Sequence, residues 1–461
     1  MDYVYKKRLT RMEKFEEENT QLLSTKNNCL KWMSLLAGGF AHAMLASNLI
    51  FYVYINDIKE RFRFDQKEVE AFASMLNAGI GLGFVPNLIG QKLKSTWVLA
   101  FGMVLSTIGI LMLWSSTKMV SFYEDKSWLM ALYFLISGLG GSVGYIMALR
   151  FNAEHFADDK RGRVIAIMFV FIDSGMISFT LIYYHAFPPE TRFEGLLIIL
   201  VSFNAVVYIF CMIFLRPPST NKQSVDESEL QVSGFKYETL QEECQILKEK
   251  SFRDLLVTVD YHLLAWMCSL TFAVSLLLSN NMTVLTKEEE LSSFDNVTTL
   301  LYPPIVIVSA LSFSAVSDKI KNVVSRITFL IIGGLFLALS SLLNAFLSSN
   351  KAIIATALVL AAIATGMVYT IGPTTMSEQF HIDNFMRNWG IVMFMRAILI
   401  IILHVIFGAF YDIEIQATDG LFCKGLHCTR NGYILTCAVS LIAIGLGVCL
   451  NFRIKKRRSK T

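Results

Sequence analysis

Long apolar stretches alternate with short polar segments along all 461 residues of this chain. An α-helix needs roughly 20 apolar residues to cross the hydrocarbon core of a bilayer. The stretches are continuously apolar, without the alternation typical of barrel strands, so they predict helices. The expected spans are twelve, at residues 32–56, 70–91, 95–116, 127–150, 164–186, 194–215, 259–284, 297–317, 326–348, 352–377, 388–411 and 431–452.

The longest polar segment lies in the middle of the chain and divides these spans into six and six. Composition supports the membrane assignment, because 54% of the residues are hydrophobic and 17% are charged, which is more apolar surface than a soluble core can hide. The prediction is an all-α polytopic membrane protein with an N-terminal tail (1–31), a first bundle (32–215), a central loop (216–258), a second bundle (259–452) and a basic tail (453–461).

Orientation follows from the Lys and Arg residues, since short cytoplasmic loops carry an excess of them. Most of the 41 fall on the side of the N-terminus, so both termini are predicted to be cytoplasmic. The basic tail from Arg453 to Lys460 predicts contact with the membrane surface, and no basic, aromatic-interleaved groove suggests nucleic acid.

The N-terminal tail has one short sorting signal. Glu18, Leu22 and Leu23 have the acidic dileucine spacing that sorting adaptors read on vacuolar and lysosomal proteins. The alternative is an ordinary amphipathic juxtamembrane segment. The location is therefore predicted as the plasma membrane or a vacuolar or lysosomal membrane.

The two halves of the chain show an internal repeat. Glu154 matches Glu378 at an offset of 224 residues, and the same offset pairs Tyr145 with Tyr369 at the ends of spans four and ten. Repeated halves indicate two pseudo-symmetric six-helix bundles.

A second match lies after spans two and eight. Residues 83–92, the first gate segment, contain Gly83, Asn87, Gly90 and Lys92 at the spacing of a G-x-x-x-D-x-x-G-x-K/R motif; residues 314–321, the second gate segment, contain Asp318. In that motif the acid caps a helix end and pairs with a basic residue, which stabilises one gate conformation. Because Asn87 replaces the acid, the first segment can form hydrogen bonds but no salt bridge.

This motif and the repeat resemble the major facilitator superfamily, and further short motifs resemble its nodulin-like family. The resemblance implies a twelve-helix fold with a substrate site near the midplane and alternating access. It also implies that spans one, four, seven and ten line the cavity. The further motifs are Phe64-Asp65-Gln66, Trp97-Val98-Leu99-Ala100, Arg161-Gly162-x-Val164, Tyr184-His185-Ala186-Phe187, Ser279-Asn280-Asn281, Gly408-Ala409-x-Tyr411-Asp412 and Cys423-x-Gly425-x-x-Cys428.

Polar residues in those four spans are candidate substrate contacts on the strength of the resemblance. The alternative is that they form hydrogen bonds between helices. His42 and His404, within spans one and eleven, are more typical of packed side chains than of coupling groups. The candidates are Asn48, Tyr52, Tyr145, Asn280, Asn281 and Tyr369.

Two charged residues lie deep inside predicted spans. Asp173 is near the middle of span five, and Arg396 is near the middle of span eleven. A charge at this depth costs a few kcal/mol, so it normally faces protein or water and has a function. Arg396 can bind a substrate carboxylate or phosphate, or it can serve in a structural ion pair or a contact to carbonyls. Asp173 can accept a proton, or it can lock two helices together or remain a neutral acid.

One pair of cysteines, Cys423 and Cys428, lies in a loop on the side away from the termini. A disulfide that braces the loop is expected, and metal binding with His427 is the alternative. No cofactor is predicted, because the chain has no phosphate loop, no Gly-x-Ser-x-Gly and no His-Glu-x-x-His.

These patterns favour a secondary transporter of a small anionic or zwitterionic metabolite, with a proton as a candidate coupling ion, in a lipid bilayer. The alternative is a nutrient receptor or adaptor that has the fold but no turnover. An intramembrane enzyme would require His, Asp or Ser clustered at one depth, which the sequence does not show.

Overall fold

The structure, a computed structural model, describes residues 29–64, 66–90, 93–156, 160–217, 252–281, 292–347, 350–380, 382–418 and 427–458. Twelve of its helices are long and apolar enough to cross a membrane. The predicted number of spans is therefore confirmed.

The first half of the molecule (residues 29–217) contains six spans. The first span, Cys29–Ile55, turns at Ile50 and includes the start of α2. The helices of this half are α2 (Phe51–Phe62), α3 (Gln66–Leu82), α4 (Phe84–Ile89), α5 (Ser95–Ser116), α6 (Val120–Tyr123), α7 (Ser127–His155), α8 (Arg161–His185) and α9 (Arg192–Phe214).

The second half (residues 252–458) contains the other six spans. A short helix, α11, precedes them, and a 3-10 turn, η2, joins α16 to α17. The helices are α11 (Phe252–Val257), α12 (Val259–Asn280), α14 (Ser292–Ile320), α15 (Arg326–Phe346), α16 (Lys351–Gln379), η2 (Ile382–Asn384), α17 (Phe385–Thr418) and α18 (His427–Arg458).

The helix bounds agree with the repeat read from the sequence. Helices α7 and α16 are both 29 residues long and begin 224 positions apart, at Ser127 and Lys351. Helices α8 and α17 begin at Arg161 and Phe385, with the same separation. The repeat therefore extends to the start of spans five and eleven.

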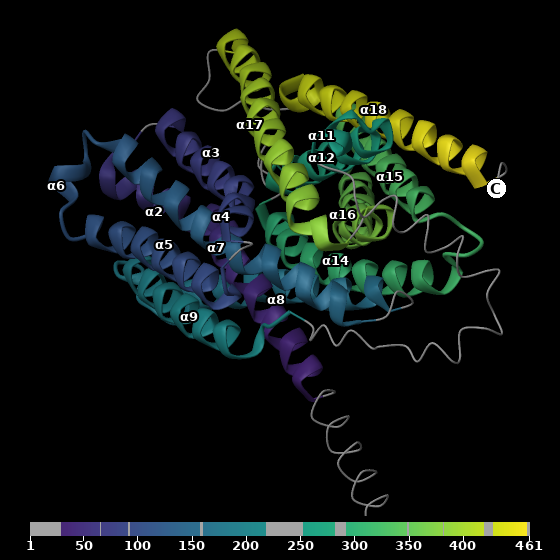
Figure 1. The fold of residues 1–461 in the computed structure, drawn as a ribbon. Helices are drawn as coiled ribbons and strands as arrows, with labels where there is room; N and C mark the ends of the chain where they lie inside the picture. The colour runs from purple at the N-terminus through teal and green to yellow at the C-terminus, as the bar shows by residue number, and fades with distance from the viewer. Residues whose placement is uncertain are drawn as a thin grey trace, which may run out of the picture.

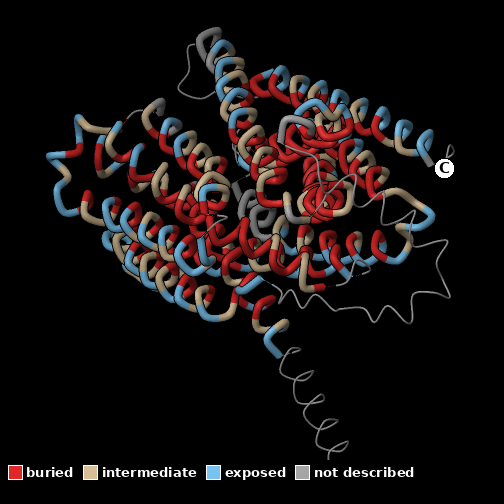
Figure 2. The backbone as a smooth tube through the Cα atoms, in the orientation of Figure 1, coloured by how far each residue is buried: buried red, intermediate tan, exposed pale blue. Residues whose placement is uncertain are grey.

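The two halves meet along a few helices. Figure 1 shows α8 lying beside α14 and α17 crossing between the two groups of helices, and α17 also packs against α3 and α4. Close approach at α17 depends on a glycine, because a Cβ on Gly81 would lie 2.6 Å from the Ala397 Cβ. Helices α7, α12 and α16 are largely buried, whereas α5 and α9 have exposed outer faces (Figure 2).

Candidate substrate site and gate

Arg396 lies on α17 where this helix packs against the first half, and its side chain is buried. Its Nη2 donates a hydrogen bond to Asn77 Oδ1 on α3 at 3.2 Å. Asn77 holds that oxygen toward Arg396 because its own Nδ2 donates to the Ala73 carbonyl. The Arg396 Nε is buried without an acceptor among the described residues. The guanidinium group therefore still has a donor to offer.

Asp173 lies near the middle of α8 and is half-buried. Its carboxylate interacts electrostatically with Tyr302 on α14 and Tyr369 on α16. Within the described residues no ion pair joins Asp173 to Arg396 or to any other cation. Tyr369 interacts electrostatically with both charges. Both charges thus interact with one tyrosine, and among the described residues they form no ion pair with each other.

A set of hydroxyl groups in the second half lies near Asp173. Ser275 Oγ and Thr365 Oγ1 are 2.6 Å apart, and the Tyr302 hydroxyl lies 2.7 Å from the same Thr365 oxygen. Ser275 also interacts with Tyr369. These four residues, the hydroxyl cluster, come from α12, α14 and α16, and both α14 and α16 pack against α8.

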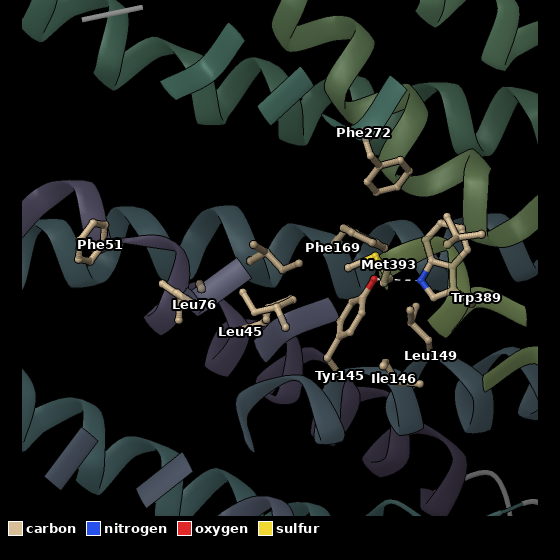
Figure 3. Close-up of a cluster of buried hydrophobic side chains, with 14 of the residues drawn as sticks. Leu45, Phe51, Leu76, Tyr145, Ile146, Leu149, Phe169, Phe272, Trp389 and Met393 are labelled. Atoms are coloured by element: carbon tan, nitrogen blue, oxygen red, sulfur yellow. Dashed lines mark hydrogen bonds between the residues drawn. The ribbon is translucent and has the colours of Figure 1, made fainter. Parts of the chain in front are cut away.

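Aromatic rings from both halves form a second cluster (Figure 3). Trp389 Nε1 on α17 donates to the Tyr145 hydroxyl on α7 at 3.2 Å, and this bond joins the two halves. Tyr369 stacks on Phe272 with ring centroids 4.4 Å apart, and Phe169 on α8 lies 6.0 Å from Tyr369. We call these five residues the aromatic cluster.

Trp389 of the aromatic cluster lies nearer to the chain termini than Arg396 does. Trp389 is four residues after the start of α17, and Arg396 is seven residues further along. At 1.5 Å per residue this places Trp389 about 10 Å closer to the end of the bundle that carries the termini, which we call the terminal end. The contact between Trp389 and Tyr145 thus joins the two halves on the terminal side of Arg396.

His42 packs against the same cluster. Its ring lies 4.8 Å from Tyr145 and 5.4 Å from Phe169, measured between centroids. Nδ1 lies 2.7 Å from the Gly38 carbonyl and must donate to it, so Nε2 is the acceptor in the neutral ring. Nε2 is buried without a partner among the described residues.

Other candidate contacts lie within one half. Asn48 accepts a hydrogen bond from Ser137 at 2.8 Å, and its Nδ2 lies near Gly141 in the packing of spans one and four. Asn280 lies 3.4 Å from His404, and Asn281 donates to the Leu277 carbonyl. The side chain of Tyr52 lies outside the description. The structure therefore brings together Arg396, Tyr145, Tyr369 and Asp173 but not the three asparagines.

Several site residues have no sequence signal comparable to a buried charge. Asn77 is an amide in span two, Trp389 is a tryptophan near the start of span eleven, and Ser275, Tyr302 and Thr365 carry ordinary helix hydroxyls. Their partners are remote in the chain, so helical periodicity does not indicate the contacts. Among the described residues, no three His, Cys, Asp or Glu side chains are grouped to hold a metal ion.

The second gate segment joins the two halves through ion pairs. Asp318, at the end of α14, accepts hydrogen bonds from the backbone N–H groups of Gly162 (3.2 Å) and Arg163 (2.9 Å) at the start of α8. Arg326 donates at 2.7 Å to Asp318 Oδ1, the oxygen that also accepts from Gly162, and its Nε donates to Glu378 at 2.6 Å. Asp318 and Arg326 are both nearly inaccessible, with 1% and 3% of their side chains exposed. A buried charge network thus joins the two halves at the terminal end.

The first gate segment has different contacts. Asn87 Nδ2 donates to the Gly83 and Val143 carbonyls of its own half, at 3.0 and 3.2 Å, and its buried Oδ1 has no partner among the described residues. A Cβ on Gly83 would collide with Ser142, and one on Gly90 with Val98. Contact with the other half is apolar, through Phe84 and Phe394. Lys92 lies outside the described residues.

At the opposite end, a group of ion pairs lies within the first half. Arg192 donates to the Asp57 carboxylate at 2.8 and 3.0 Å, and the Tyr183 hydroxyl donates to it as well. Arg61 and Glu194 form a further ion pair. Burial would raise the pKa of the Asp57 carboxyl, but the hydrogen bonds from Arg192 and Tyr183 bring that pKa below its ordinary value.

Other expectations fall partly outside the described residues. Cys428 is disulfide-bonded, but its expected partner Cys423 is not described, so the pairing stays a prediction. Glu18, Leu22 and Leu23 also lie outside the description. In the basic tail, Arg453 donates to Asp260 on α12 at 2.6 Å.

Comparison with known proteins gives one family match. Residues 35–404 match the family model described as Major Facilitator Superfamily. Among curated proteins, none matches the chain.

Solved structures with the same fold are transporters. The proton:xylose symporter XylE bound to 6-bromo-6-deoxy-D-glucose has a TM-score of 0.68 and 13% identity, over 91% of this chain and 95% of that one. FucP in the outward conformation has a TM-score of 0.58 and 12% identity, over 90% and 98%. An outward-facing bacterial homologue of the iron transporter ferroportin has a TM-score of 0.62 and 14% identity, over 91% and 99%. At these identities the similarity shows the fold alone.

Proposed function

Because this chain belongs to the major facilitator superfamily, we propose that it is a secondary active transporter that moves a small metabolite across a membrane by alternating access. The sequence motifs favour its nodulin-like branch. The distribution of Lys and Arg favours a cytoplasmic terminal end, in a plasma, vacuolar or lysosomal membrane.

The observation that carries this proposal is that Arg396 is buried without a carboxylate partner among the described residues. A buried guanidinium group without a carboxylate partner costs several kcal/mol unless an anion binds to it. Its planar fork suits a carboxylate or a phosphate. We therefore assign the anionic group of the substrate to Arg396, with Tyr145 and Tyr369 beside it.

Asp173 is proposed as the position that receives an accompanying positive charge. For a purely anionic substrate this charge is a proton, and uptake then follows the proton gradient. The contacts of the two halves at the terminal end support a state that is closed there, with the site reached from the other end. FucP and the ferroportin homologue are described in outward states, which agrees with this arrangement.

The test is uptake by proteoliposomes across a panel of carboxylates, amino acids and sugars, with and without an inward proton gradient. Arg396→Gln should weaken substrate binding about 10- to 100-fold, since hydrogen bonds to charged groups contribute about 1.5–3 kcal/mol. Arg396→Lys is the matched control: it keeps the charge but loses the fork, so it should rescue binding in part. Unchanged uptake in Arg396→Gln would assign this side chain a structural role, and a folded wild type that binds but never transports would favour a receptor.

A further inference from the structure

The Thr365 hydroxyl determines which groups of the hydroxyl cluster donate hydrogen bonds and which accept them. The Thr365 hydroxyl donates its only hydrogen to the Ala361 carbonyl one turn earlier, at 2.8 Å. The Thr365 oxygen must therefore accept in its contacts with Ser275 at 2.6 Å and with Tyr302 at 2.7 Å. Ser275 and Tyr302 each use their single hydrogen in this way.

Tyr302 is therefore left with acceptor lone pairs and no free hydrogen. Its side chain is half-buried, whereas Ser275 and Thr365 are buried. The Tyr302 oxygen can thus accept a hydrogen from a bound ligand.

Asp173 adds a second acceptor group, on α8 where this helix packs against α14, the helix of Tyr302. No described cation forms an ion pair with Asp173. Arg396, which interacts electrostatically with Tyr369, has donors only. The interface between the halves thus contains two sites of opposite charge preference, which we call the two poles: Arg396 for an anion, and Asp173 with Tyr302 for a cation with several hydrogens.

We propose that the substrate is a zwitterion of the amino acid class, whose carboxylate binds Arg396 and whose ammonium group binds Asp173 and Tyr302. An ammonium group offers three hydrogens in a compact shape, so it can donate to the two carboxylate oxygens and to the phenol oxygen together. A proton on Asp173 would neutralise the carboxylate but supply only one hydrogen to these acceptors. This inference rests on the proposed function and names the positive charge that Asp173 receives.

The test uses sets of three matched compounds. Each amino acid is compared with its N-acetyl derivative, which keeps the carboxylate alone, and with its carboxamide, which keeps the ammonium group alone. Binding to the purified full-length protein is measured by thermal shift, and transport by counterflow in proteoliposomes. At least one free amino acid should bind, and both of its derivatives should bind more than about 30-fold more weakly, since each leaves one pole unpaired.

Variants then test whether Asp173 and Tyr302 bind the ammonium group. Asp173→Asn should weaken binding of the free amino acid about 10-fold or more and leave binding of the N-acetyl derivative unchanged. Tyr302→Phe removes one acceptor without removing a charge, so it should cost a smaller factor, about 3- to 10-fold, again for the free amino acid alone. This second variant keeps the test valid if Asp173→Asn does not fold.

Two other results would overturn the inference. If an N-acetyl derivative or another plain carboxylate is accumulated in a proton gradient, and Asp173→Asn abolishes that dependence, Asp173 receives a proton and the proposed function stands without the zwitterion. If a sugar is transported and Arg396→Gln has no effect, neither pole binds substrate. Absence of any transport or binding across the whole panel would instead contradict the proposed function itself.

Discussion

The two gate segments occupy equivalent places in the two halves but contact the opposite half by different means. The first presents Phe84 to α17 and keeps the hydrogen bonds of Asn87 within its own half. The second presents the Asp318 carboxylate to the start of α8. A backbone repeat can therefore be symmetric while only one of the two equivalent segments uses a charged group to contact the opposite half.

The difference arises from one side chain and its surroundings. An ionised carboxylate is attracted by the first N–H groups of a helix and by nearby arginines, and Asp318 has both. Asn87 is neutral, and the groups around it are backbone carbonyls. We infer that closure of the terminal end depends more on the second segment than on the first.

Replacing Asp318 should have the largest effect. Asp318→Asn removes the charge beside Arg326, which is buried and keeps Glu378 as its remaining acid among the described residues. Breaking one partner of a buried ion pair costs about 3 kcal/mol, so the closed state should lose most of its population. The measurement is thiol labelling of Ser377→Cys, a buried position at the terminal end, in a background without other reactive cysteines. Labelling as slow as in the parent protein would show that the ion pair does not hold the gate.

A methyl group at Gly162 should have the next largest effect. Its Cβ would press on the Asp318 carboxylate and lie 3.1 Å from Arg326 Nη1, so Gly162→Ala should weaken closure by about 1–3 kcal/mol. Transport rate and Ser377→Cys labelling report the change. Gly445→Ala is the matched control, because a Cβ there meets nothing within 4 Å. Equal behaviour of the two variants would contradict the close fit of Asp318 against α8.

Restoring the acid in the first segment should not create a second ionic gate. In Asn87→Asp, a carboxylate would face the Gly83 and Val143 carbonyls and lose two hydrogen bonds, which costs about 1–3 kcal/mol of stability. The measurement is the melting temperature in detergent, with Asn87→Ala as the variant that loses the hydrogen bonds without gaining a charge. A melting temperature above that of the wild type would mean that Asn87→Asp finds a cation, so that the two segments are interchangeable.

The smallest effect is expected at the opposite end. The pKa of Asp57 is below its ordinary value of 3.8, so its ion pair with Arg192 contributes stability above about pH 4 and loses it as the pH falls through the lowered pKa. Asp57→Asn should therefore melt below the wild type at pH 7, and the two curves should converge in acid. Labelling of Ser377→Cys should not change, because the pair lies within the first half. A constant difference down to pH 3 would show that Asp57 acts without its charge.

The sequence predicted the features that follow from local pattern. Span number, the repeat offset and the two buried charges come from hydropathy and composition, and the repeat also pointed to Tyr145 and Tyr369. The sequence left open whether Asp173 and Arg396 pair with each other, and within the described residues they do not. The resemblance named Asn48, but which neighbour a helix face meets depends on packing, and Asn48 meets Ser137 of the same half.

The hydroxyl cluster near Asp173 could not be predicted for the same reason. Ser275, Tyr302 and Thr365 are hydroxyl residues of three separate spans, and such residues are common inside membrane helices. The bond between Tyr145 and Trp389 joins residues 244 positions apart. A contact between remote spans follows from how whole helices pack, and no spacing within either span carries that information.

The most direct test of closure by the second gate segment is a pair of spin-label distances measured by double electron–electron resonance. One pair, at Leu93 and Val323, spans the halves at the terminal end, and the other, at Met119 and Leu347, spans them at the opposite end; all four side chains are exposed. Asp318→Asn should lengthen the first distance and shorten the second in a large part of the population, whereas Asn87→Ala should leave both near their wild-type values. Unchanged distances in Asp318→Asn, or an equal change in Asn87→Ala, would contradict the account.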